Sequence, residues 1–100
     1  MNRVKNGYTI VTISIVASVA QISMPTIFIE GFKFRFYSSD INEPPHMHVI
    51  QDDNVAKIWL QPIKVEYNHG YNRPTLNRIL KLTRQNQERL LEAWNAHFSR

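Results

Sequence analysis

Two kinds of hydrophobic pattern run along this chain, and together they predict a small α+β protein. Over residues 26–37 and 46–61, apolar and polar residues alternate with a period of two, which is typical of half-buried strands. From Thr75 onward the apolar residues recur every three or four positions, as on one face of a helix. We therefore expect a small antiparallel sheet of two hairpins, with four to five strands, packed against a C-terminal helix or a kinked helix pair.

The first hairpin is predicted to turn at Glu30-Gly31, because glycine readily takes the positive φ that tight turns require. This turn pairs Ile29 with Phe32 and keeps the apolar side chains together on one face. That face carries Ile27, Ile29, Phe32, Phe34 and Phe36. The opposite face carries Thr26, Phe28, Lys33, Arg35 and Tyr37.

The second hairpin is predicted to turn around Asp53-Asn54, since both residue types tolerate the left-handed conformation. Its core face then carries Met47, Val49, Ile58 and Leu60. Its polar face carries His46, His48, Ile50, Lys57, Trp59 and Gln61, with Trp59 across from His48. The segment after Pro62 is expected to be a loop with a short strand at Ile63–Tyr67.

The helical stripe weakens between Thr83 and Gln87, which predicts either one long helix or two segments kinked there. At the other end of the chain, residues 1–23 differ in composition from the rest. Arg3 and Lys5 precede an apolar stretch, an order that resembles a secretory signal but also suits an added strand or a dispensable extension. We expect an N-terminal extension over residues 1–23 and a single domain over residues 24–100.

Composition narrows the function classes only a little. The formal net charge is +4, from 12 basic and 8 acidic residues, which tolerates a nucleic-acid partner without arguing for one. The absence of cysteine excludes a disulfide scaffold, thiolate zinc ligands and a cysteine nucleophile. The N-terminal apolar stretch is too short and too interrupted to span a bilayer, so no membrane partner is expected.

The chemistry of the chain centres on the run Glu43-Pro44-Pro45-His46-Met47-His48-Val49. The two prolines stiffen the entry to a strand, and the alternation of strand side chains places His46 and His48 on one face. Such a pair binds a metal, exchanges protons, contacts phosphate, or has a structural role by hydrogen-bonding backbone or packing on Trp59. A metal site needs a third ligand, for which Asp40, Glu43 and His69 are candidates, with His69 the first place to look.

Two functional hypotheses use this face. In the first, His46 and His48 are catalytic candidates, with Lys57 or Arg35 as the cation that a metal-free ribonuclease requires. In the second, aromatic and basic side chains form a binding surface for a partner protein or single-stranded RNA. That surface consists of Phe28, Lys33, Arg35, Tyr37, His46, His48, Lys57 and Trp59.

Several stretches together resemble a known family. They are Met24-Pro25-Thr26-Ile27, Gly31, Phe36-Tyr37-Ser38, the Glu43–Val49 run, Lys57-Ile58-Trp59-Leu60, Asn86, and Leu90-Leu91-Glu92-Ala93-Trp94. Over residues 24–100 the chain resembles the small bacterial domain-of-unknown-function family 4160. The resemblance implies a prokaryotic, cytoplasmic protein whose gene lies beside that of another small protein, as in toxin–antitoxin-like pairs. It implies no established activity.

The sequence thus favours an interaction module of a toxin–antitoxin-like pair, which binds a partner protein or RNA through the aromatic–basic face. The rival is a metal- or histidine-dependent hydrolase, of which a ribonuclease is the expected kind. The geometry of His46, His48 and His69 discriminates between them. Convergence of the three imidazoles on an open point favours the enzyme, whereas divergence or burial favours the module.

Overall fold

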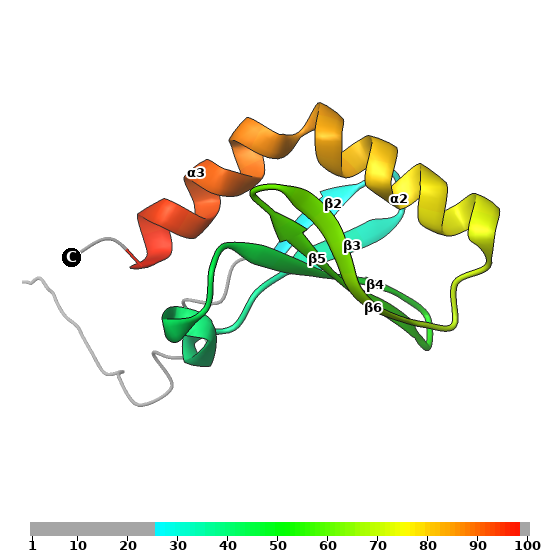
Figure 1. The fold of residues 1–100 in the computed structure, drawn as a ribbon, viewed down its shortest axis with the longest axis horizontal. Coiled ribbons are helices and arrows are strands. Elements are labelled where there is room, and N and C mark those ends of the chain that lie inside the picture. Colours follow the sequence, from blue (N-terminus) through cyan, green and yellow to red (C-terminus); the bar gives the residue numbers. More distant parts are fainter. Residues whose placement is uncertain (1–25, 99–100) are drawn as a thin grey trace, which may run out of the picture.

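The computed structural model describes residues 26–98, which form five strands, a short 3-10 helix and two α-helices. The strands make one antiparallel sheet in which each strand pairs with its neighbours in the chain, in the order β2-β3-β4-β5-β6 (Figure 1). The predicted α+β fold is therefore confirmed, with five strands. The elements are β2 (Thr26–Ile29), β3 (Phe32–Arg35), η1 (Ser38–Asn42), β4 (His46–Gln51), β5 (Asn54–Leu60), β6 (Ile63–His69), α2 (Arg73–Gln85) and α3 (Gln87–Phe98). The predicted N-terminal extension over residues 1–23 lies outside the described residues.

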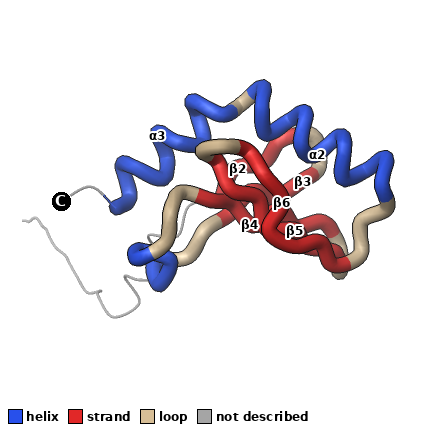
Figure 2. The backbone as a smooth tube through the Cα atoms, in the orientation of Figure 1, coloured by secondary structure: helices blue, strands red, loops and turns tan. Residues whose placement is uncertain are grey.

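Both α-helices lie over the same face of the sheet (Figures 1 and 2). The short helix η1 lies at one end of the sheet, on the side opposite the α-helices. The core fills the space between helices and sheet. Its buried apolar side chains are Ile29, Phe32, Phe34, Phe36, Met47, Val49, Ala56, Ile58, Leu60, Tyr71, Ile79, Leu82, Leu90 and Trp94. Within residues 26–98, neither helix combines the length and the apolar character that a membrane-spanning helix needs.

The hairpin of β2 and β3 has the predicted turn and register. Glu30 and Gly31 adopt φ values of 47° and 89°, so both turn residues are left-handed, as a two-residue hairpin loop requires. Ile29 pairs with Phe32 and Ile27 pairs with Phe34. The phenylalanines of β3 consequently enter the core, as the alternation of apolar residues predicts.

The hairpin of β4 and β5 turns one residue earlier than predicted. Asp52 and Asp53 form the turn, with Asp52 at φ 54°, and Asn54 already pairs with Gln51. Aspartate reaches the left-handed region at modest cost because its short side chain hydrogen-bonds locally. The sequence offers three consecutive residues of this kind, so the local pattern alone does not fix the turn.

This earlier turn changes which side chains face one another across β4 and β5. Trp59 pairs with His46, not with His48 as predicted, and His48 pairs with Lys57. The displacement is an even number of residues, so the side chains stay on their predicted faces of the sheet. The predicted core face of this hairpin is therefore correct, whereas the predicted cross-strand neighbours of each histidine are not.

The C-terminal stripe folds as the kinked pair. The helix α2 ends at Gln85 and α3 begins at Gln87, with the break at Asn86, whose side-chain amide donates to the carbonyl of Leu82 at 2.9 Å. The side-chain amide of Gln87 donates to the carbonyl of Leu60 at 2.7 Å. Polar side chains at the weak part of the stripe thus satisfy the backbone at the break and fasten it to the sheet.

Candidate functional site

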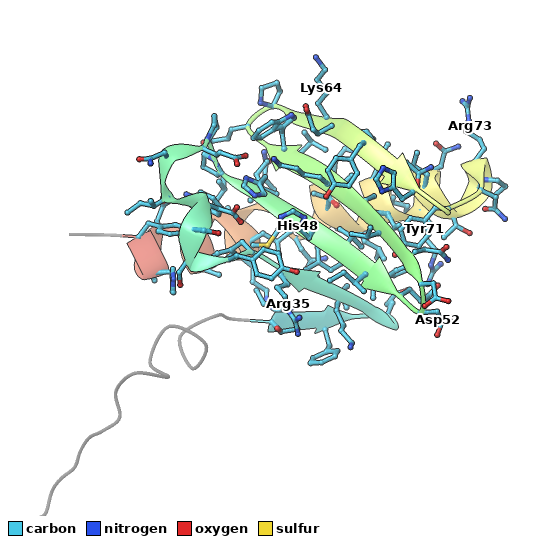
Figure 3. The ribbon with its side chains drawn as sticks, turned by 90° about the horizontal axis from the view of Figure 1, so that it is seen from below. Arg35, His48, Asp52, Lys64, Tyr71 and Arg73 are labelled. Atoms are coloured by element: carbon cyan, nitrogen blue, oxygen red, sulfur yellow. The ribbon has the colours of Figure 1, made fainter. Side chains whose placement is uncertain are left out.

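Strand pairing and, for Tyr37, its contact with His48 place the side chains predicted to bind a partner on the face of the sheet opposite the helices, and seven of the eight are at least partly exposed. Figure 3 shows this face, with Arg35 and His48 labelled on it. We call this surface the open face and define it as Phe28, Lys33, Arg35, Tyr37, His48, Lys57 and Trp59. Of the elements in the described range, only η1 lies on this side, and it sits at one end of the sheet (Figure 1). The open face exists because strand side chains alternate and the helices cover only one side.

The exposure of these side chains differs along the face. Phe28 is 67% exposed and Lys33 is also exposed, so both project from the β2–β3 edge. The other five are half-buried. Across the strands, Arg35, His48 and Lys57 are direct neighbours in one row, which aligns three nitrogen-bearing side chains over the middle of the sheet.

The charges on the open face are mixed. Lys57 Nζ lies 2.6 Å from Glu43 Oε1 and 4.8 Å from the ring centre of Trp59, and Trp59 Nε1 donates to Glu66 Oε1 at 2.8 Å. Partial burial tends to lower the pKa of Lys57, but the hydrogen bond and charge of Glu43 outweigh it and raise that pKa. Lys57 is therefore a paired cation.

Glu66 contacts this site but was not predicted from the sequence. A bulge in β6 beside the Lys57/Ile58 pairing interrupts the alternation of side chains there.

The eighth predicted side chain, His46, leaves β4 on the same side, opposite Trp59, but it has no exposed surface, which corrects its prediction as part of the binding surface. Its side chain is fully buried, with its ring 5.0 Å from that of Trp94 and 5.4 Å from that of Trp59. Its Nδ1 lies 3.0 Å from the carbonyl oxygen of Pro44. The structural interpretation, in which the imidazole bonds backbone at the strand entry and packs on Trp59, therefore describes His46 correctly.

The burial of His46 has a tertiary cause. The start of β4 lies between η1 and the end of α3, where Ser38 Oγ is 3.2 Å from His97 Nε2. Alternation along β4 predicts only the side from which the His46 side chain leaves the backbone. It contains no information about elements that close over the end of the strand.

Three potential metal ligands nevertheless meet at this end of the sheet. Asp40 Oδ2 lies 3.1 Å from His46 Nε2 and 3.7 Å from His48 Nε2. One ligand atom from each of the three residues lies within 4.8 Å of the other two. The side chain of Asp40 is 12% exposed and that of His48 is 13% exposed, so the cluster reaches the surface beside the open face. We call these three residues the Asp–His–His cluster.

The surroundings of His48 disfavour its charged form. Burial is the largest effect and the nearby His46 adds to it, so that the pKa of His48 is lowered despite the opposing charge of Asp40. Its Nδ1 lies 3.4 Å from the hydroxyl of Tyr67, and its ring lies 5.0 Å from that of Tyr37. The ring of His48 therefore lies between two tyrosines, with Nε2 toward Asp40, in surroundings that favour the neutral imidazole.

The third histidine predicted as a metal ligand, His69, does not join this cluster. It is exposed at the end of β6, stacked on the ring of Tyr67 at 4.7 Å, and it pairs with Val55 near the opposite end of β5 from Trp59. Among the third ligands considered from sequence, the structure selects Asp40. The reason is η1, which follows β3 and turns Asp40 back toward β4.

Comparison with known proteins gives a family and no closer relative. The family model described as a domain of unknown function (DUF4160) matches residues 31–95, which confirms the resemblance inferred from the sequence. Neither the curated proteins nor the solved structures include a match.

Proposed function

The chain belongs to the DUF4160 family, whose function is unknown, and we propose that it is an interaction module that binds a small partner protein through the open face. In this proposal the partner is encoded by the adjacent gene, and the two proteins form a toxin–antitoxin-like pair.

Phe28 is the observation that carries this proposal. The other phenylalanines of the first hairpin and its exit, Phe32, Phe34 and Phe36, are at most 3% exposed, whereas Phe28 is 67% exposed. A large apolar side chain that projects from a face with further aromatic rings is typical of a protein–protein contact, where aromatic residues supply much of the binding energy. Phe28 would be the anchor of the interface.

The charges favour a protein partner over RNA. A surface that follows a nucleic-acid backbone presents cations that are free to replace counterions. Here Lys57 is paired with Glu43, and Glu66 holds the indole nitrogen of Trp59. Both carboxylates would repel phosphate beside Lys57 and Trp59, while a protein partner of mixed charge complements them.

A histidine-dependent hydrolase is less well supported. A ribonuclease of that kind needs two imidazoles that reach one phosphodiester, one to accept and one to donate a proton. The His46 side chain has no exposed surface and His69 lies far along the sheet. The burial of His46 and the separation of His69 from the other two histidines are the features that favour the interaction module.

Binding of the full chain to the product of the adjacent gene tests the proposal by isothermal titration calorimetry. Phe28→Ser should weaken the affinity about tenfold or more, the effect expected of an interface anchor. The matched control is Ile41→Ser, because Ile41 is the other exposed large hydrophobic residue of the described range and lies on η1. It should bind as the wild type does.

Three results would contradict the proposal: no binding of that protein, equal losses for both variants, or no loss for Phe28→Ser. A parallel titration with single-stranded RNA at two salt concentrations separates the other partner class. RNA binding that falls steeply with salt, without protein binding, would replace the protein interface by a nucleic-acid one.

A further inference from the structure

The imidazole of His46 has a buried nitrogen, Nε2, that lacks a hydrogen-bond partner. The carbonyl oxygen of Pro44 can only accept a hydrogen bond, so the 3.0 Å contact requires that Nδ1 carry the proton. In the neutral tautomer with the proton on Nδ1, the lone pair of the ring is on Nε2. Among the side chains of residues 26–98, this Nε2 is the buried polar atom that lacks a hydrogen-bond partner.

The nearest polar atom to that nitrogen is itself an acceptor. Asp40 Oδ2 lies 3.1 Å from His46 Nε2, but their contact does not have hydrogen-bond geometry. Two lone-pair atoms at this distance repel each other unless a cation lies between them. A proton on Nε2 would favour a straight N–H···O contact, whereas a metal ion can bind both atoms from a point off the line that joins them.

The spacing of the Asp–His–His cluster suits such an ion. Two N or O ligands that are each about 2.0–2.2 Å from one metal lie roughly 3.0–3.5 Å from each other, depending on the coordination geometry. The distances from Asp40 Oδ2 to the two imidazole nitrogens are 3.1 and 3.7 Å. One ligand atom from each residue lies within 4.8 Å of the other two, and side-chain movements that shorten the longer of these distances would place all three around one ion.

Each ligand is also held in place by a second contact. His46 Nδ1 contacts the Pro44 carbonyl and His48 Nδ1 lies 3.4 Å from the Tyr67 hydroxyl, so both rings turn Nε2 toward the cluster. The backbone amide of Tyr37 donates to Asp40 Oδ2 at 2.9 Å. Outer contacts of this kind orient metal ligands and fix the imidazole tautomer.

We infer that Asp40, His46 and His48 bind one divalent first-row transition-metal ion of the Zn²⁺ type. Two imidazoles with one carboxylate suit zinc and its neighbours, whereas Mg²⁺ and Ca²⁺ prefer oxygen ligands. The partly exposed edges of Asp40 and His48 give the ion a way in from the open face. The ion would join η1 to β4. The inference shares His48 with the open face but does not rest on the binding of a partner there.

Calorimetric titration of the metal-free full chain with Zn²⁺ tests this inference. The wild type should bind one ion per chain, and saturating Zn²⁺ should raise its melting temperature. Asp40→Asn and His48→Gln should each weaken binding roughly tenfold or more. Asparagine keeps an oxygen that can accept from the Tyr37 amide, so this variant removes the charge and spares that bond.

His69→Gln is the matched control, because it removes an exposed imidazole from outside the cluster and should bind Zn²⁺ as the wild type does. Nitrogen-15 NMR of wild-type imidazoles gives a second readout that does not depend on the variants' folding. Zn²⁺ should shift the Nε2 signals of His46 and His48 and leave His69 unchanged. The inference fails if the folded wild type does not bind Zn²⁺ stoichiometrically, or if His46 carries protons on both nitrogens and its spectrum does not respond to the ion. It also fails if His69→Gln weakens binding as much as His48→Gln.

Discussion

The ammonium nitrogen of Lys57 lies 2.6 Å from a carboxylate oxygen of Glu43, which ties β5 to the loop that leads into β4. Glu43 belongs to the proline-containing run, and Lys57 lies on the open face beside His48. The pair therefore connects the candidate interface to the entry of the strand that carries both histidines. It also removes a free cation from the open face.

This ion pair should contribute little to stability. A double-mutant cycle with Lys57→Met and Glu43→Gln should give a coupling of about 0.5 kcal/mol, because the Glu43 side chain is 42% exposed and water screens the pair. Urea unfolding measures the coupling. It should shrink further at 1 M salt, where the Debye length is about 3 Å. A coupling that stays the same in high salt would show that the contact is not mainly electrostatic.

Ile58→Ala should destabilise the domain strongly. The Ile58 side chain is completely buried in the core, and its truncation should cost about 2–5 kcal/mol of unfolding free energy. Lys64→Ala, on the exposed edge of β6, is the control and should change stability by less than about 0.5 kcal/mol. Urea unfolding compares the two variants, and similar losses would contradict the assignment of the two faces.

Gly70→Ala should be more harmful than Gly31→Ala. Both glycines have positive φ, 108° and 89°, so alanine is strained at either position. At Gly31 the new Cβ would meet its nearest neighbour at 3.5 Å, which is ordinary contact. At Gly70 it would lie 2.0 Å from Asn54 Oδ1, so the side chain of Asn54 must move.

Thermal melting of the two glycine variants checks this order. The difference between them should largely disappear when Asn54→Gly is added to both, since that change removes the clashing side chain. If Gly70→Ala remains the worse variant on that background, backbone strain rather than the clash sets its cost.

Stability should fall in alkali because of Tyr71. Burial raises the pKa of Tyr71 above its usual value of 10.0, and its hydroxyl donates to the carbonyl of Val49 at 2.9 Å. Above pH 10 the unfolded chain loses this proton more readily than the folded chain, so ionisation favours unfolding. The contribution is fully present below pH 10 and declines as the pH rises toward the folded-state pKa.

Tyr71→Phe isolates this effect. At neutral pH the variant should lose about 1 kcal/mol, the typical net worth of one hydrogen bond. Between pH 9 and pH 11 its melting temperature should fall less steeply than that of the wild type. Parallel curves would mean that other groups cause the alkaline loss.

Which side of each strand faces the core follows from the amino-acid sequence alone. The period-two alternation decides which side chains of β3, β4 and β5 enter the core, and an even displacement of the register leaves that choice unchanged. The helical stripe likewise predicts helix from Thr75 onward and leaves two alternatives, one long helix or two segments kinked between Thr83 and Gln87, of which the structure has the second. These features are local, since each depends on residues a few positions apart.

The assembly of the candidate site depends instead on tertiary contacts. The alternation places His46 with His48, but contacts from η1 and Trp94 bury His46 alone. The choice of Asp40 over His69 as the third member of the cluster depends on how η1 folds back onto β4. Such contacts join residues that are distant in the chain, and they form only where several elements pack together. The hydrophobic pattern of a single segment contains no information about these long-range contacts, so they cannot be predicted from it.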